Sequence, residues 1–388
     1  MAKSVTCSAP VNIAVIKYWG KRDEELVLPV NSSLSATLHQ NELRATTTVS
    51  RCESFDKDRM WLNGREQSID NPRLQACLRE IRKIAENGRA NEHIHICSVN
   101  NFPTAAGLAS SAAGYACLVF SLAKLFEIEG DTSTLARQGS GSACRSMYGG
   151  FVRWNKGSSL DGSDSCAVQI VSHNHWPELE VLILVVNDQA KGTSSTVGMR
   201  RSVETSELLK HRAEAIVPPR LAKLEKAIQE KDFNTFGLLT MQESNQFHAV
   251  CLDTYPPIVY MSEISRQIVN IVTCYNDYHK TIKAAYTFDA GPNAVVYVQS
   301  GDIPEFLALV KHFFPPSDST DSFIRGRSTS TGDTPQIEEL LRRMASQLRV
   351  PGALRYIIHT AVGPGPQVLD PENSLLGPSG LPKTQFLL

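Results

Sequence analysis

In the first half of the chain, apolar residues mostly alternate with polar ones or form short β-branched runs. Both patterns are typical of strands with one or both faces buried. The longest purely aliphatic run, 181–186, is far too short to cross a bilayer and indicates a buried strand. The expected strands are 11–19, 35–49, 93–96, 151–154 and 179–186, with later ones at 284–288, 294–298 and 356–362.

In the second half, apolar residues recur every three or four positions, which is the spacing of an amphipathic helix. The segment 317–335 is polar and rich in Gly, Ser and Thr, and it predicts a surface loop. Strands dominate the first half and helices the second, which predicts an α+β protein of two domains, 1–190 and 191–388. The C-terminal strand and tail, 355–388, are candidates to pack back onto the first domain. The expected helices are 72–86, one that starts in 107–114 and continues through 118–126, 132–139, a short one that begins over 140–145 and ends at 149–150, most of 202–251, 258–274 and 303–313.

The charge balance narrows the classes of partner. Lys and Arg total 39 against 40 for Asp and Glu, so the net charge is −1. Nucleic-acid binding usually needs a basic excess, whereas a local cationic pocket does not. The nine cysteines are scattered singly, which favours free thiols in a reducing compartment. No secretory signal is visible at the first residues, and we expect a cytosolic protein without membrane attachment.

Small residues between Pro103 and Gly114 precede an apolar stripe at helical spacing. The free N–H groups at such a helix start, with the hydroxyls of Ser110 and Ser111, would bind an anion. A helix of small residues packed tightly against a neighbour explains the composition equally well. The segment is neither a Walker A loop nor a GxGxxG motif.

A second loop-to-helix transition follows at Gly139, with Arg145 one turn into the helix. Ser140 and Ser142 could bind phosphate there, or could simply cap the helix. Two such transitions together with an arginine favour a polyanionic substrate.

Three further residues suggest chemistry without proving it. Lys17 and Lys21 would share one face of a strand with Trp19, and a lysine in an apolar strand needs an anionic partner. The alternative is an edge-strand lysine that reaches solvent. Asp289 lies at a strand end before a Gly-Pro turn, where catalytic residues and simple turn formers are both common.

Taken together, these segments resemble the mevalonate diphosphate decarboxylase family, within the superfamily of galactokinase, homoserine kinase, mevalonate kinase and phosphomevalonate kinase. The resemblance runs from about residue 5 to 383. The loop 103–114 is common to the superfamily. The Lys-Tyr-Trp-Gly-Lys and Phe-Asp-Ala-Gly-Pro segments are specific to the decarboxylases. The similar segments are 12–23, 103–114, 139–150 and 286–293.

The resemblance implies a fold and a reaction. The fold has a strand-rich ATP-binding domain, a helix-rich domain with the catalytic aspartate, and a deep cleft between them. ATP and Mg²⁺ would serve to phosphorylate the 3-hydroxyl of mevalonate 5-diphosphate, and loss of phosphate and CO2 would give isopentenyl diphosphate. A homodimer is also implied. The Mg²⁺ would be held mainly by the phosphates with a Ser110 or Ser111 hydroxyl, and no carboxylate ligand can be assigned. A plain phosphotransferase and a non-catalytic relative remain as alternatives.

The resemblance also assigns residues. Asp289 would face the 3-hydroxyl, accept its proton late and stabilise positive charge at C3. Arg145 would bind the substrate carboxylate, and Lys17 would lie near the transferred phosphoryl group. Ser195 and Thr196 fall in a flexible loop expected to close on the ligands. The other substrate-binding positions implied are Tyr18, Trp19, Gly20, Lys21, Arg73, Ser140, Gly141, Ser142, Ala143 and Cys144, and the nucleotide-binding positions are Asn100, Gly107, Leu108, Ala109, Ser110 and Ser111.

Overall fold

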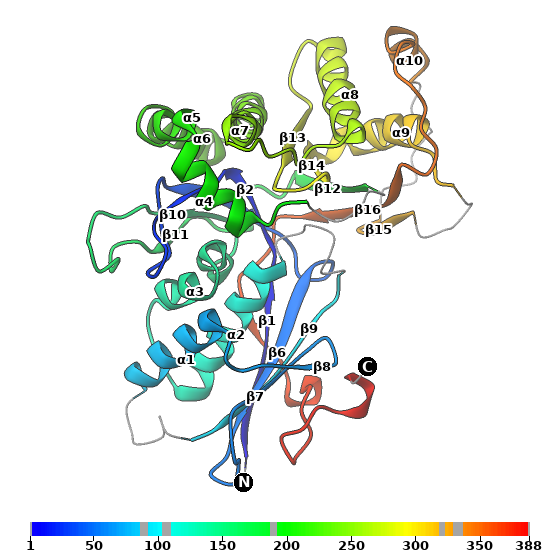
Figure 1. The fold of residues 1–388 in the computed structure, drawn as a ribbon. Coiled ribbons are helices and arrows are strands. Elements are labelled where there is room, and N and C mark those ends of the chain that lie inside the picture. Colours follow the sequence, from blue (N-terminus) through cyan, green and yellow to red (C-terminus); the bar gives the residue numbers. More distant parts are fainter. Residues whose placement is uncertain are drawn as a thin grey trace.

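The computed structural model describes residues 2–85, 92–102, 110–186, 192–317, 323–328 and 337–386. Its largest sheet has the strand order β17-β1-β6-β9-β7-β8 and runs through the lower part of Figure 1. All its pairings are antiparallel except the one between β7 and β9. Its strands are β1 (Lys3–Pro10), β6 (Arg44–Arg51), β7 (Arg59–Leu62), β8 (Arg65–Gln67), β9 (Ile94–Asn100) and β17 (Gln367–Val368).

A second, four-stranded sheet has the order β11-β10-β5-β2. A short hairpin of β3 (Lys21–Asp23) and β4 (Leu28–Pro29) follows β2 in the chain. The strands of the four-stranded sheet are β2 (Asn12–Ile16), β5 (Ser33–Thr37), β10 (Phe151–Trp154) and β11 (Ala167–Val171).

The third sheet has the order β13-β14-β12-β16-β15 and lies in the upper part of Figure 1. Its pairings are antiparallel apart from the parallel pair of β15 with β16. The central strand β12 is buried at every position, as its aliphatic run predicts. The strands are β12 (Leu179–Val186), β13 (Ala284–Phe288), β14 (Ala294–Gln299), β15 (Ile324–Gly326) and β16 (Leu354–Ala361).

Three helices lie to one side of β1, β6 and β9 in Figure 1, and a 3₁₀ helix, η2, follows them in the chain. In α1, Asn71 caps the first turn by accepting from the N–H groups of Arg73 and Leu74. Ten of the 17 residues of α2 are buried, and all ten are small or apolar, because the helix packs directly on β1 and β6. The elements are α1 (Pro72–Ile84), α2 (Ser110–Phe126), α3 (Ser133–Gly139) and η2 (Gly141–Met147).

The remaining helices gather around the third sheet and above the four-stranded one (Figure 1). The long helix α7 packs against both β13 and β2, so it connects the two regions. The helices are α4 (Ser195–Thr205), α5 (Glu207–His211), the π-helical turn η3 (Arg212–Ile216), α6 (Val217–Glu230), α7 (Phe233–Asp253), α8 (Glu263–His279), α9 (Ile303–Phe313) and α10 (Glu338–Arg343), with the short 3₁₀ turn η4 (Ser300–Asp302). Two further 3₁₀ turns, η5 (Pro371–Asn373) and η6 (Thr384–Phe386), belong to the C-terminal tail, which lies beside the largest sheet in the lower part of Figure 1.

Most expected elements are present, and the α+β class is confirmed, but four expectations were wrong. The segment 35–49 forms two strands in different sheets, because the chain turns between β5 and β6. The strand expected over 11–19 ends at Ile16 after a bulge, so Lys17, Trp19 and Lys21 do not share a strand face. The helix expected from 258 begins at Glu263, where Ser262 forms a capping box. Part of the loop expected over 317–335 is the strand β15.

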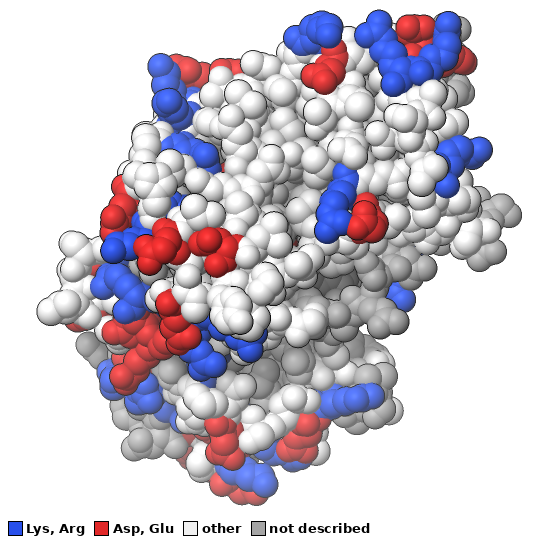
Figure 2. Space-filling view, turned by 45° about the horizontal axis from the view of Figure 1, so that its top comes forward, with Lys and Arg blue, Asp and Glu red and all other residues white. Residues whose placement is uncertain are grey.

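Two further observations bear on partners. Within the described part of the chain, no helix is long and apolar enough to cross a membrane. On the face shown in Figure 2, basic and acidic side chains lie beside one another rather than gathering by sign. The division into domains at residue 190 stays a prediction.

Candidate active site

A cavity of about 800 Å³ opens where the ends of β2, η2, α1 and α4 meet the turn after β13. The described residues that line it include five cations, Lys17, Lys21, Arg73, Arg79 and Arg145, of which the sequence predicted all but Arg79. Asp289 lies among them. The other predicted residues found in the lining are Tyr18, Trp19, Ser110, Ser111, Ser140, Gly141, Ser142, Ser195 and Thr196.

Lys17 and Asp289 form an ion pair across the cavity, with 2.6 Å between Nζ and Oδ1. The lysine side chain is 3% exposed, and that of Asp289 is 32% exposed. Burial lowers the pKa of Lys17, and the carboxylates of Asp289 and Glu243 oppose this effect. The anionic partner that an inward-facing lysine needs is therefore Asp289.

Arg145 is buried in η2 with no ion pair among the residues the structure describes. Its Nε and Nη1 donate to the hydroxyls of Ser35 and Ser33, at 3.0 and 2.6 Å. Burial lowers the pKa of Arg145, and the charge of Asp289 acts in the opposite direction. Its guanidinium also lies over the Trp154 ring, 6.0 Å from the centroid. A buried guanidinium beside a cavity that has neutral partners and no carboxylate among the described residues is ready to bind an anion.

Tyr18 forms a wall of the cavity between η2 and β10. Its ring packs edge-on against Trp154, with 4.7 Å between centroids. Its hydroxyl is buried and has no hydrogen-bond partner among described residues. Burial raises the pKa of Tyr18, so the hydroxyl stays protonated and available as a donor. Gly141 allows this packing, because a Cβ there would lie 2.8 Å from the tyrosine ring.

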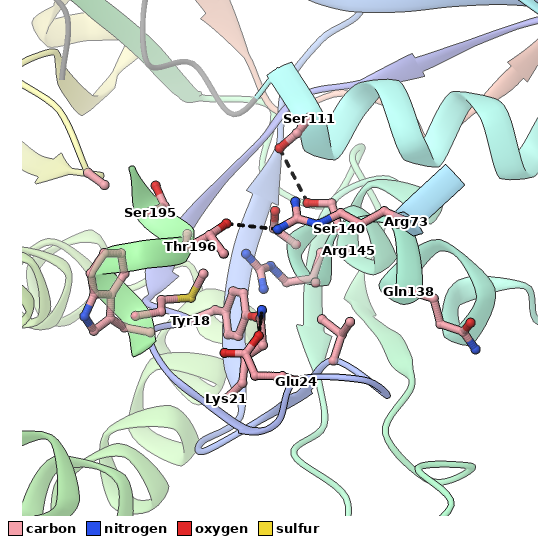
Figure 3. Close-up of a pocket in the computed structure, with 18 of the residues that line it drawn as sticks. Tyr18, Lys21, Glu24, Arg73, Ser111, Gln138, Ser140, Arg145, Ser195 and Thr196 are labelled. Carbon is pink, nitrogen blue, oxygen red and sulfur yellow. Dashed lines mark hydrogen bonds and ion pairs between the residues drawn. The ribbon is translucent and has the colours of Figure 1, made fainter. Parts of the chain in front are cut away.

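Lys21 lies in the β3 hairpin and pairs with Glu24, three residues later (Figure 3). The lysine side chain is 6% exposed, whereas that of Glu24 is 53% exposed. This pair is local in sequence and its carboxylate faces solvent. An incoming anion can therefore replace Glu24 as the partner of Lys21 at small cost.

Arg73 and Thr196 connect opposite sides of the cavity. Arg73 Nη2, in the first turn of α1, donates to Thr196 Oγ1 at 2.9 Å (Figure 3). Ser195 and Thr196, expected in a flexible loop, are the first two residues of α4, which Ser194 caps. Ser111 and Ser140 lie 3.5 Å apart between their Oγ atoms, so the two predicted phosphate-binding segments approach each other.

A second cavity of about 370 Å³ adjoins the first, since Ser110 and Ser111 line both. Asn100 also lines it, from the end of β9. The rest of its described lining is mainly apolar or uncharged: Thr47, Met60, Leu62, Gln67, Ser68, Asn71, Leu74, Ile96, Ser98, Gly114, Tyr115 and Leu118.

Some predicted residues do not line either cavity. Gly20 has a φ of 94° and packs where a Cβ would lie 2.9 Å from Val203, so its role is structural. Ala143 and Cys144 are fully buried behind the η2 backbone, and burial raises the pKa of the Cys144 thiol to about 12. Gly107, Leu108 and Ala109 lie outside the described residues.

The sequence interpretation missed several residues around the cavity. Asn12 lines it with a buried Oδ1 that has no partner among described residues. Its position at the start of the family-like segment 12–23 was the available signal. Glu24, Glu25 and Arg79 also line the cavity and carried no signal. In the described residues, no three His, Cys, Asp or Glu side chains are grouped to hold a metal ion.

Two family models match the chain along most of its length. The "Diphosphomevalonate decarboxylase-like N-terminal domain" matches residues 9–167, and the "Mevalonate 5-diphosphate decarboxylase C-terminal domain" matches residues 181–369. The diphosphomevalonate decarboxylase of Bos taurus is 56% identical, covering 98% of this chain and 97% of the relative.

Solved structures agree with these matches. The mevalonate diphosphate decarboxylase from Trypanosoma brucei is 38% identical with a TM-score of 0.87, covering 97% of this chain and all of that one. The structure of MDDEF in complex with MVAPP, AMPPCP and magnesium is 31% identical with a TM-score of 0.75, covering 95% and 100%. The chain therefore belongs to the diphosphomevalonate decarboxylase family, as its sequence resemblance predicted.

Proposed function

We propose that the protein uses ATP to decarboxylate mevalonate 5-diphosphate, giving isopentenyl diphosphate, ADP, phosphate and CO2. In this proposal Arg145 binds the substrate carboxylate, Asp289 acts on the 3-hydroxyl and C3, and Lys17 lies near the transferred phosphoryl group. One observation carries this assignment: five cations, among them Lys17, Lys21, Arg73 and Arg145, line a single cavity together with Asp289, and this cavity adjoins a second one with an uncharged lining. A diphosphate, a carboxylate and a transferring phosphoryl group together need such a set of cations.

Lys21 and Arg73 would bind the diphosphate end of the substrate. When the substrate binds, phosphate oxygens would replace Glu24 as the partner of Lys21. Arg73, in α1, has a guanidinium that can make bidentate contacts with phosphate. Tyr18 and the hydroxyls of Ser140 and Ser142 supply neutral donors nearby.

Arg145 would hold the substrate carboxylate, because its guanidinium is buried and, among the described residues, donates hydrogen bonds to neutral hydroxyls and forms no ion pair. Asp289 would then face the 3-hydroxyl, orient it and accept its proton as the phosphoryl group of ATP is transferred to the oxygen. Lys17 donates to Asp289 and carries positive charge near the transferred group. When the phosphate leaves, Asp289 returns the proton to a phosphate oxygen, and its carboxylate then stabilises positive charge at C3 until loss of CO2 forms the double bond.

The nucleotide would occupy the second cavity, with its phosphates near Ser110 and Ser111, which face both cavities. Uncharged and apolar walls suit a purine base. The related complex contains AMPPCP and magnesium. The described residues here offer hydroxyls rather than a carboxylate cluster, so Mg²⁺ would be held mainly by the phosphates, with Ser110 or Ser111 as a protein ligand. The metal would neutralise phosphate charge.

Family membership supports three further proposals: a homodimer, a cytosolic location, and a division into the domains 1–190 and 191–388. Analytical ultracentrifugation of the purified chain tests the first of these. A single species at the monomer mass would contradict it.

The reaction itself is tested by supplying ATP and mevalonate 5-diphosphate labelled in its carboxylate, and following ADP and CO2 together. We expect the two products in equal amounts. ADP without CO2 would indicate a phosphotransferase, and neither product would indicate a non-catalytic binding protein; either result overturns the proposal.

A further inference from the structure

Two consecutive residues of α7 contact the two backbone segments that carry Lys17 and Asp289. Glu243 Oε1 accepts from the backbone N–H of Lys17 at 2.9 Å. Ser244 Oγ accepts from the backbone N–H of Phe288, the residue before Asp289, at 3.0 Å. Both side chains are buried, with at most 1% exposed. Neither lines the cavity, so an effect of either residue on the reaction must pass through Lys17 or Asp289, by these backbone contacts or, for Glu243, also by its charge.

On the Lys17 side, the contact replaces a missing sheet partner. The strand β2 ends at Ile16, and a buried backbone amide beyond the ladder needs another hydrogen bond. Glu243 accepts the N–H of Lys17, while Arg212 Nη2 and Asn31 Nδ2 each donate to its carbonyl at 3.1 Å. The backbone of Lys17 is therefore held at both its N–H and its C=O.

Arg212 and Glu243 also form an ion pair with each other, and both are fully buried. A second arginine, Arg220, donates to Glu243 Oε2 at 2.6 Å. Burial alone would raise the pKa of Glu243, but the two arginines and the Lys17 amide outweigh it, and the net pKa is lowered. The ionised Glu243 in turn raises the pKa of Lys17, against the effect of burial.

On the Asp289 side, the contact fixes the end of an edge strand. Among the described strands, β13 pairs only with β14, and α7 packs against it. Phe288 is the last residue of β13, so its N–H bond to Ser244 fixes the backbone at the point where Asp289 leaves the strand.

The two contacts come from one rigid element. Successive residues of a helix lie 1.5 Å apart along its axis and about 100° apart around it. They can therefore hold two different segments at a fixed separation. Lys17 and Asp289 are 272 positions apart in the sequence, and their side chains meet at 2.6 Å.

We propose that Glu243 and Ser244 are positioning residues that set the geometry of the Lys17–Asp289 pair for the reaction. This rests on the proposed function. The hydroxyl of Ser244 is the better target for a test, because its removal leaves no buried charge unpaired.

Ser244→Ala is compared with Thr240→Val, since Thr240 lies one turn earlier on α7 and is also buried. Its hydroxyl has no partner among described residues. We expect Ser244→Ala to lower kcat on the order of tenfold, because small displacements of reacting groups are costly. In Ser244→Ala, KM for both substrates should stay within about twofold of the wild-type values. Its Tm should be close to that of Thr240→Val, and Thr240→Val should have the kcat of the wild type. Equal kcat in the two variants, or a change in KM alone, would overturn the proposal.

A double-variant experiment separates positioning from other causes. In an Asp289→Asn background, Ser244→Ala should cause little further loss of kcat, because its effect passes through Asp289. A full additional tenfold loss would show that Ser244 acts elsewhere and would overturn its assignment. If the proposed function fails, the wild-type chain releases no CO2; if only the positioning fails, the wild type is active and Ser244→Ala matches it.

Glu243→Gln tests the other contact through its pH profile. The glutamine keeps an oxygen that can accept from the backbone N–H of Lys17, but it removes the negative charge that raises the pKa of the Lys17 side chain. We expect the alkaline fall in kcat to move to lower pH with KM unchanged; a profile identical to wild type would contradict the role of Glu243. Circular dichroism reports whether the variant folds. If it does not, Ser244→Ala decides the proposal.

Discussion

Two lysines four residues apart in the chain, Lys17 and Lys21, each pair with a carboxylate beside the same cavity. The two pairs differ in how far apart their partners lie in the sequence. Lys17 pairs with Asp289 from a distant strand end, and its backbone is held by Glu243 and Arg212. Lys21 pairs with Glu24 within one hairpin. The carboxylate is 32% exposed in the first pair and 53% exposed in the second. A pair fixed by tertiary structure suits chemistry, and a local, exposed pair suits exchange with a substrate phosphate.

The largest effect is expected when the fixed pair loses its carboxylate. Asp289→Asn should lower kcat by at least about a hundredfold while mevalonate 5-diphosphate still binds, because loss of a group that accepts a proton typically costs 10²–10⁴. Steady-state turnover together with equilibrium binding checks this. A loss of less than tenfold with intact binding would show that Asp289 does not have this role.

The lysine of the same pair should give the reaction an alkaline limit. Burial lowers the pKa of Lys17, so kcat should fall as pH rises through a value below 10.5, where the ammonium loses its proton. In Lys17→Met, kcat should drop about a hundredfold and the remaining activity should lack this limb. An unchanged alkaline limb in the variant would assign it to another group.

His248, beside the fixed pair, should make stability depend on pH. Burial lowers its pKa from 6.5 to about 4, with the charge of Lys17 acting in the same direction and Asp289 opposing it. At pH values between about 4 and 6.5, His248 is protonated in the unfolded chain but not in the folded one, so the free energy of unfolding falls as pH falls. From pH 7 to 5 this group should contribute a loss of about 2 kcal/mol. Urea unfolding of wild type and His248→Gln measures it, and equal pH slopes would refute it.

The smallest effect is expected in the exchangeable pair. Glu24→Gln removes a competitor for Lys21, so KM for mevalonate 5-diphosphate should fall, by up to about fivefold given the exposure of the pair. The kcat should not change. A rise in KM would mean that Glu24 helps to bind the substrate.

The two pairs also show what the sequence could predict. The local pattern of Lys17, Lys21 and Asp289 was visible, and the family resemblance linked the three residues. The strand face assigned to both lysines was wrong, because the bulge and the early end of β2 depend on pairing with β5. Alternation alone could not reveal that break, nor the turn that divides 35–49, since polar Thr-rich residues continue on both sides.

Contacts between segments that are distant in the sequence could not be predicted from the local pattern of residues. Glu243 lies 226 positions from Lys17 and reads as an ordinary polar position on an amphipathic helix. Ser33 and Ser35, which hold Arg145, likewise belong to a plain alternating strand. Their roles follow from how β5, η2 and α7 pack, which no local propensity determines.

The central claim is the division of work between the two pairs, and one paired measurement tests it directly. The equilibrium Kd for mevalonate 5-diphosphate and the single-turnover rate at saturating substrate are determined for Asp289→Asn and Lys21→Gln. We predict a Kd near wild type with a rate lowered at least about a hundredfold for Asp289→Asn, and a raised Kd with a rate within about threefold of wild type for Lys21→Gln. The reverse pattern, or equal losses of binding and rate in both variants, would contradict it.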